Sequence, residues 1–293
     1  MTAPRLLLRG ATYLVTRRTL RREFLLRPGK LPNQIFGYLL ARAAQVTGIQ
    51  VHCFCFMSNH YHLVVTDPDA RLPEFGGYLD SLIARAVNAL YGLDGTFWEG
   101  GSFNATRITT PHDIVDRCAY ALANPVAAGL VRKGRQWPGL WSGPDLLGAR
   151  LEFERPAHFF SEAGHMPREV VLELVAPPGF DSVGRFREEL EEAWRAKERA
   201  ATDGRPSVLG VARVLKQRIF DRPARPKRRG GLRPRFAARD LGRRVDLARQ
   251  LKTFLARYQH ALQEWRAGRR ETVFPEGTYQ MRVLHQVACA GAG

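Results

Sequence analysis

The chain has 293 residues, enough for one sizeable hydrophobic core and a length more typical of two domains than of one. Its 45 Lys and Arg residues outnumber its 28 Asp and Glu residues, and the net charge of +17 favours a polyanionic partner, with nucleic acid first. No run of about eighteen apolar residues is present, and the first ten residues hold too short an apolar stretch for a signal peptide. We therefore expect a cytosolic, nucleoid-associated protein with no membrane contact.

The pattern of the first half predicts a small α+β domain. The expected elements, in chain order, are a strand over 12–16, a helix over 31–47, two hairpin strands over 49–56 and 61–65, a helix over 72–91, a Gly-broken strand pair within 96–108 and a helix over 113–124. Gly48 ends the first helix, whereas Thr110 and Pro111 begin the last one. This order describes a small antiparallel sheet covered by helices.

The second half predicts a different kind of structure. We place a domain boundary after 1–150, a linker over 151–180, where periodicity is weak, and a basic helical region over 181–293 that contacts DNA. Its expected helices cover 180–200, 208–220 and 240–266.

Basic residues gather in one part of the second half. Between Arg213 and Arg249 there are 14 basic and three acidic residues, a net charge of +11. We expect an arm here that contacts DNA phosphates, although a flexible solubilising linker is the alternative. Its expected DNA-binding residues are Arg225, Lys227, Arg228, Arg229, Arg233 and Arg235.

Two histidines flank a single residue at the start of the second hairpin strand. Side chains at i and i+2 of a strand share a face, so His60 and His62 project together and Tyr61 projects the opposite way. On the last helix, positions i and i+4 place the phenol of Tyr120 beside the carboxamide of Asn124, and the helix is expected to end there because Pro125 follows. These residues together predict a metal site next to a nucleophile.

The donor set indicates which metal such a site would hold. Two imidazoles and one amide oxygen, with no thiolate, suit Mg²⁺ or Mn²⁺ acting on a phosphate better than a closed structural zinc site. We expect Mg²⁺ in the cell, with Mn²⁺ able to substitute. The four cysteines, Cys53, Cys55, Cys118 and Cys289, show no CxxC pairing and are expected to be reduced and mostly buried.

Two segments together resemble a known family. Residues 57–65, Met-Ser-Asn-His-Tyr-His-Leu-Val-Val, and residues 120–131, Tyr-x-x-x-Asn-Pro-Val-x-Ala-Gly-Leu-Val, are similar to the single-tyrosine HUH transposases, most closely the REP-associated tyrosine transposases. The resemblance covers roughly residues 10–145. It implies a ferredoxin- or RRM-like HUH domain in which His60, His62 and Asn124 bind a divalent metal and Tyr120 is the nucleophile.

The resemblance also implies an activity and a substrate. Attack by the tyrosine would leave a 5′-phosphotyrosine and a free 3′-OH, so that single-stranded or hairpin DNA is cut and rejoined without ATP. Arg17, Arg18, Arg21 and Arg22 correspond to a region that meets single-stranded DNA in the family, although a plain charged surface is equally compatible with them.

Other readings of the same residues remain open. The histidine pair can be structural, Tyr120 can be a core aromatic residue, and Asn124 can cap its helix. A domesticated, catalytically silent protein that binds structured DNA or RNA is the main alternative function, and a rolling-circle replication initiator is disfavoured because the chain lacks a helicase-type phosphate loop. The sequence leaves open a monomer or a homodimer, and whether Tyr120 acts within its own chain.

Overall fold

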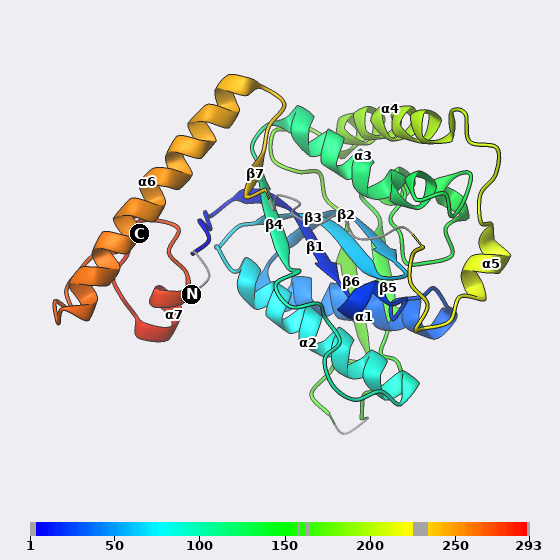
Figure 1. Ribbon diagram of the computed structural model, residues 1–293, viewed down its shortest axis with the longest axis horizontal. Helices are drawn as coiled ribbons and strands as arrows, with labels where there is room; N and C mark the ends of the chain where they lie inside the picture. Colours follow the sequence, from blue (N-terminus) through cyan, green and yellow to red (C-terminus); the bar gives the residue numbers. More distant parts are fainter. Residues whose placement is uncertain (1–3, 158, 162–163, 225–233, 292–293) are drawn as a thin grey trace.

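The structure, a computed structural model, describes residues 4–157, 159–161, 164–224 and 234–291. Its centre is a five-stranded sheet in the order β2-β3-β1-β4-β7, with α1 and α2 on one side and α3 and α4 on the other (Figure 1). The elements of the first half are β1 (Ala11–Arg18), α1 (Lys30–Thr47), β2 (Gln50–Met57), β3 (His60–Asp67), α2 (Leu72–Tyr91), β4 (Asn104–Ile108) and α3 (Pro111–Ala127).

The first four strands form an antiparallel sheet with helical connections. The chain runs β1-α1-β2-β3-α2-β4, and β3 lies between β1 and β2, so every neighbouring pair among these strands is antiparallel. This arrangement confirms the α+β prediction, and β7 adds one strand parallel to β4. Helices cover both faces, which explains why β2 and β3 are almost entirely buried rather than alternately exposed.

The Gly-broken strand pair expected within 96–108 is wrong, because only β4 is a strand there. The first part of this segment makes one isolated bridge, between Trp98 and Thr19. Phe97 and Trp98 are buried, and the indole nitrogen of Trp98 donates a hydrogen bond to the backbone oxygen of Asp80 at 2.8 Å. Phe97 and Trp98 therefore pack in the core without forming a strand.

Helix α3 continues through Pro125, so the expected end at Asn124 is wrong. Proline removes one backbone donor, but Val126 is fully buried and packs with Met57, Val131 and Trp137. This burial offsets the loss of one helical hydrogen bond. The helix stops only before Gly129, which adopts the left-handed conformation with φ of 71°.

The prediction of a linker over 151–180 is also wrong. Strands β5 (Arg150–Glu154) and β6 (Glu169–Glu173) form a two-stranded sheet within it, and both strands contact α1. An added Cβ at Gly37 of α1 would lie 2.2 Å from the Phe153 ring, so only glycine allows this approach. Val170 and Leu172 join the main core. β5 has the sequence Arg-Leu-Glu-Phe-Glu and alternates as a strand does, whereas β6 has the sequence Glu-Val-Val-Leu-Glu and does not, so their pairing is not evident from the sequence.

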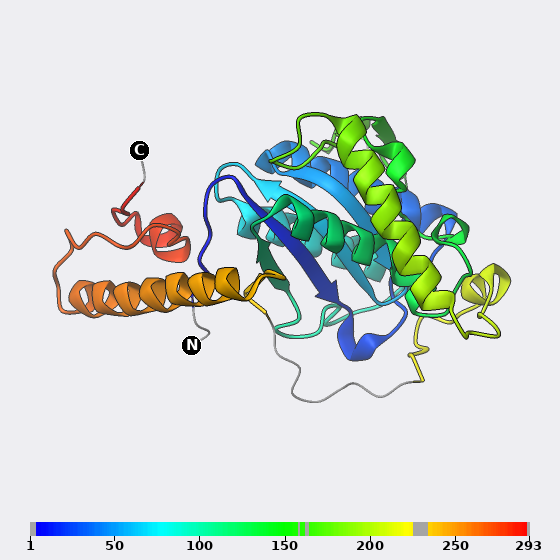
Figure 2. The same ribbon diagram turned by 90° about the horizontal axis from the view of Figure 1, so that it is seen from above.

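The remaining helices confirm the helical character of the C-terminal region. They are α4 (Val183–Thr202), α5 (Val211–Leu215), α6 (Leu241–Arg266) and α7 (Gln280–His285), with the short strand β7 (Phe236–Ala237) before α6. Helix α4 packs along α3, whereas α6 extends away from the sheet with α7 beside it (Figure 2). The helix expected over 208–220 is shorter, since only α5 forms.

Three further expectations concern charge, membranes and cysteines. The arm residues Arg225, Lys227, Arg228, Arg229 and Arg233 lie outside the described residues, so their role stays a prediction.

Among the helices of the described ranges, none combines the length and the apolar character that a bilayer crossing requires. All four cysteines are free and three of them are buried, as predicted.

Candidate active site

The two motif histidines lie side by side on one face of β3. Their ring centroids are 4.8 Å apart and the rings are perpendicular. The intervening Tyr61 points through the opposite face, where its hydroxyl donates a hydrogen bond to Oδ1 of Asp80 on α2 at 2.7 Å. The predicted alternation is therefore confirmed, and Tyr61 is a packing residue with no route to the histidines.

Helix α3 brings the predicted tyrosine and asparagine to the histidine pair. The ring centroid of Tyr120 lies 5.4 Å from that of His62. One turn later, Nδ2 of Asn124 lies 3.2 Å from Nε2 of His62. The side chains of Tyr120 and Asn124 on α3 and of the histidines on β3 thus lie together, as the helical spacing and the strand alternation predicted.

Two of the alternative readings disagree with the structure. Tyr120 is 41% exposed, which is incompatible with a core aromatic residue. Asn124 does not cap the helix with its side chain, because α3 continues to Ala127 and its cap is Ala128. The carboxamide of Asn124 is therefore directed at the histidines.

Asn59 fixes the orientation of His60. Nδ2 of Asn59 donates to the backbone oxygen of Arg22 at 3.1 Å, which leaves its Oδ1 to face His60. Nδ1 of His60 lies 2.7 Å from that oxygen. Because a carbonyl oxygen can only accept, Nδ1 must carry the proton, and Nε2 keeps its lone pair. Histidines that bind metals are commonly oriented by a second partner in this way.

Burial keeps both imidazoles neutral. It lowers the pKa of His60 to about 4, an effect increased by the nearby Arg18 and Arg22 and opposed by the hydrogen bond with Asn124. Burial also lowers the pKa of His62 well below its usual value, with further contributions from His60 and Arg18. At neutral pH both rings are therefore unprotonated, the form that can coordinate a metal.

The donor set fits a divalent cation of the Mg²⁺ or Mn²⁺ type. Within the described ranges, no three His, Cys, Asp or Glu side chains come together, so a cation here would rely on two imidazoles and the Asn124 amide. Rotation of that amide by half a turn presents its oxygen to the histidines. Nε2 is the nitrogen of His62 that faces Asn124, whereas Nδ1 is buried without a hydrogen-bond partner among these residues, so no hydrogen bond to Nδ1 fixes the tautomer of His62.

The four arginines at the end of β1 and just after it separate into two groups. Arg18 lies opposite His60 in the strand pairing and shares its face, where it is exposed. Arg22 is close enough to influence the pKa of His60, and Arg21 is exposed. Arg17 instead lies opposite Tyr61, forms an ion pair with Asp80 at 3.5 Å and packs over Trp98. Its side chain therefore faces away from the candidate active site.

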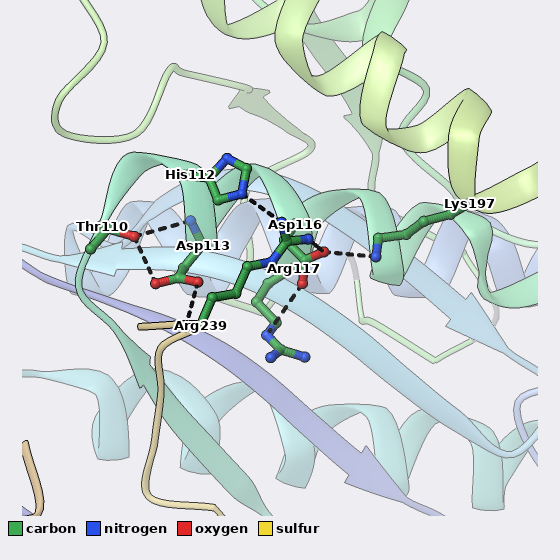
Figure 3. A network of polar contacts seen from close by, with 7 residues as sticks. All are labelled: Thr110, His112, Asp113, Asp116, Arg117, Lys197 and Arg239. Atoms are coloured by element: carbon green, nitrogen blue, oxygen red, sulfur yellow. Dashed lines mark hydrogen bonds and ion pairs between the residues drawn. The ribbon is translucent and has the colours of Figure 1, made fainter. Parts of the chain in front are cut away.

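A polar network anchors the first half of α3, and sequence reasoning missed it (Figure 3). Asp116, one turn before Tyr120, accepts from Nζ of Lys197 on α4 at 2.7 Å and from the guanidinium of Arg239 at 2.5 Å. Its second oxygen lies 3.8 Å from Nε of Arg117, which extends toward the sheet. Lys197 and Arg239 lie 81 and 123 residues from Asp116 along the chain, so no local spacing in the sequence indicates the network.

Comparisons with known proteins give structural likeness alone. No protein-family model matches the chain, and no curated protein sequence matches it. Its fold is similar to a REP-associated tyrosine transposase bound to a REP hairpin, with a TM-score of 0.41 and 19% identity over 47% of this chain and 81% of the other. It is also similar to a protein assigned as a transposase from Deinococcus radiodurans R1, with a TM-score of 0.29 and 18% identity over 37% of this chain and 87% of the other.

Proposed function

We propose that this chain is a metal-dependent transposase that cleaves and rejoins single-stranded or hairpin DNA through a 5′-phosphotyrosine intermediate. The observation that carries the proposal is the position of an exposed tyrosine, Tyr120, against a pair of neutral histidines, of which His62 is buried and His60 partly buried. A structural histidine pair needs neither an accessible phenol nor the carboxamide of Asn124 beside it. A phosphoryl-transfer site needs both a nucleophile and electrostatic stabilisation nearby.

Tyr120 would supply the nucleophile. Its phenolic oxygen loses its proton and forms a bond to phosphorus while the bond from phosphorus to the 3′ oxygen breaks, and the departing 3′ oxygen takes up a proton. The DNA 5′ end then remains on Tyr120 as a phosphodiester. Attack by a 3′-OH reverses these bond changes, so rejoining consumes no ATP.

The histidines and Asn124 would hold the cation. A divalent ion bound there neutralises charge on the phosphoryl oxygens, which lowers the barrier to attack. His60 is oriented for this role by Asn59. Arg18, exposed on the same face as His60, would attract and hold the DNA backbone.

A covalent-adduct assay tests the proposal. The full chain is incubated with labelled single-stranded hairpin DNA and Mg²⁺ or Mn²⁺, and a band that survives denaturation is sought. We expect such a band with the wild-type protein, none with Tyr120→Phe, and a strongly reduced one with His60→Ala or His62→Ala. Tyr61→Phe is the matched control, because it also removes a phenol but lies on the opposite face of the sheet.

The same assay distinguishes the main alternative. A silent structured-DNA or RNA binding protein would bind the hairpin without forming an adduct across several flanking sequences. Wild-type and Tyr120→Phe proteins would then behave identically. Equal adduct formation by both proteins would instead place the nucleophile elsewhere.

A further inference from the structure

A second group of cations lines a cleft away from the histidines. The cleft has a volume of about 350 Å³ and lies between the end of β4 and the first turns of α6. Its polar lining residues are Arg107, Thr109, Arg243, Asp246, Arg249 and Gln250. The lining therefore includes three arginines and one aspartate.

The most telling of these groups is Arg107. Its side chain is buried, since the residue is only 9% exposed, and within the described part of the chain it forms no ion pair. One terminal nitrogen donates to Oε1 of Gln250 at 2.8 Å, whereas the other is buried without a partner. Burial, together with the nearby charge of Arg243, lowers the pKa of the guanidinium. A buried cation without a counter-charge is costly.

The neighbouring residues do not supply the missing negative charge. Asp246 is largely exposed and pairs with Arg249 at 3.6 Å. The guanidinium of Arg243 reaches Thr109, whose hydroxyl is neutral, at 3.5 Å. The cleft therefore carries an excess of positive charge that an anion would balance.

The C-terminal region completes this cleft. The backbone N–H of Arg107 donates to the oxygen of Arg235, where β7 pairs with β4, and this pairing brings α6 to the edge of the sheet (Figure 1). Across the sheet, Thr16 of β1 pairs with His62 on one side and with Asn104 of β4 on the other, so Asn104 is level with the histidines. Arg107 lies three residues further along β4. Three residues of a strand span about 10 Å. The cleft is thus distinct from the candidate active site.

We infer that this cleft binds a phosphodiester group of the DNA backbone, at a position other than the one that is cut. The inference rests on the proposed function for the identity of the partner. The convergence of Arg107, Arg243 and Arg249 on one cleft makes it an anion site by itself. Planar guanidinium groups bind phosphate oxygens through paired hydrogen bonds, and Thr109 and Gln250 add neutral partners.

DNA binding across a salt series tests the site. We expect Arg243→Gln and Arg249→Gln each to weaken hairpin binding and to reduce the slope of log K against log salt by about 0.7 to 0.9. Arg244→Gln is the matched control, because it removes the same charge from an exposed position on the same helix outside the cleft. Its slope should equal that of the wild type. Adduct formation at saturating DNA by Arg244→Gln should equal that of the wild type.

A measurement with inorganic phosphate distinguishes a site for the DNA backbone from a site for a free anion. At matched ionic strength, phosphate should raise the melting temperature of the wild type more than chloride does, and Arg243→Gln should lose that increase. Stabilisation by phosphate with an unchanged DNA salt slope would mean a free-anion site and would overturn the inference. No effect in either measurement would also overturn it. Absence of any adduct, together with reduced salt slopes in Arg243→Gln and Arg249→Gln, would contradict the proposed function while leaving this site in place.

Discussion

The carboxamide of Asn124 lies 3.2 Å from Nε2 of His62, and this contact joins the helix that carries Tyr120 to the strand that carries the histidines. It places Tyr120, the proposed nucleophile, and two neutral imidazoles around one point although Tyr120 and His60 are sixty residues apart in sequence. The contact therefore predicts that Asn124 matters for cation binding as well as for the position of Tyr120.

Asn124→Ala should weaken Mn²⁺ binding by roughly tenfold or more, the loss typical when a metal-site partner is removed. The physical reason is that one of three donors disappears while the imidazoles stay in place. Free Mn²⁺ can be followed by electron paramagnetic resonance during a titration. Asn104→Ala is the control, because Asn104 lies on the same face of the sheet and bonds to Thr106 instead. Equal Mn²⁺ affinity in both variants would remove Asn124 from the site.

Asn59→Ala should also weaken Mn²⁺ binding, by about ten- to a hundredfold, because His60 loses the acceptor that fixes its ring. Asn59→Asp keeps an oxygen facing His60 but loses the donor to the Arg22 carbonyl. We therefore expect Asn59→Asp to bind Mn²⁺ much better than Asn59→Ala. Similar losses in the two variants would show that the contact with Arg22 is the important one.

Asp116→Asn should lower the free energy of unfolding by about 1 to 3 kcal/mol, because Asp116 accepts charge-assisted hydrogen bonds from Lys197 and Arg239 and is only 11% exposed. These cations lower the pKa of Asp116 below its ordinary 3.8, although burial opposes them. The stabilisation is therefore present above pH 4 and should vanish as the pH falls further. Urea denaturation at several pH values measures it, with exposed Asp203→Asn as the control. A difference that persists unchanged at low pH would refute the charge-based explanation.

Asp80→Asn should show the opposite pH dependence. Burial raises the pKa of Asp80 from 3.8 to about 6, even though Tyr61 and Arg17 lower it. The folded protein then binds more protons than the unfolded chain between these values, so ionisation of Asp80 costs stability as the pH rises from about 4 to 6. The free energy of unfolding of the variant should rise relative to that of the wild type between about pH 4 and 6, by at most about 3 kcal/mol. Exposed Asp94→Asn should show no such trend, and a constant difference for Asp80→Asn would contradict the raised pKa.

The sequence was sufficient for the features that depend on local spacing. The shared face of His60 and His62 follows from strand alternation, and the neighbouring positions of Tyr120 and Asn124 follow from the helical repeat. The order of strands and helices up to residue 127 was also largely predictable from apolar patterns. These features involve residues a few positions apart, whose relation is set by the backbone.

Features that depend on tertiary packing were missed. The burial of Val126 carries α3 through Pro125, and no local rule reveals that burial. Asp116 meets Lys197 and Arg239, which lie 81 and 123 residues away. The pairing of β7 with β4, which creates the cleft at Arg107, likewise joins distant segments. Arg17 appeared equivalent to Arg18 in the sequence, yet adjacent strand positions face opposite sides of the sheet.

The central claim is that the phenolic oxygen of Tyr120 becomes covalently attached to DNA. Its most direct test is tandem mass spectrometry of the protein after incubation with hairpin DNA and Mn²⁺, nuclease trimming and proteolysis. We predict a nucleotide phosphodiester on Tyr120 and on no other tyrosine. Attachment to Tyr78 or Tyr91, or cleaved DNA with free 5′-phosphates and unmodified Tyr120, would contradict the account.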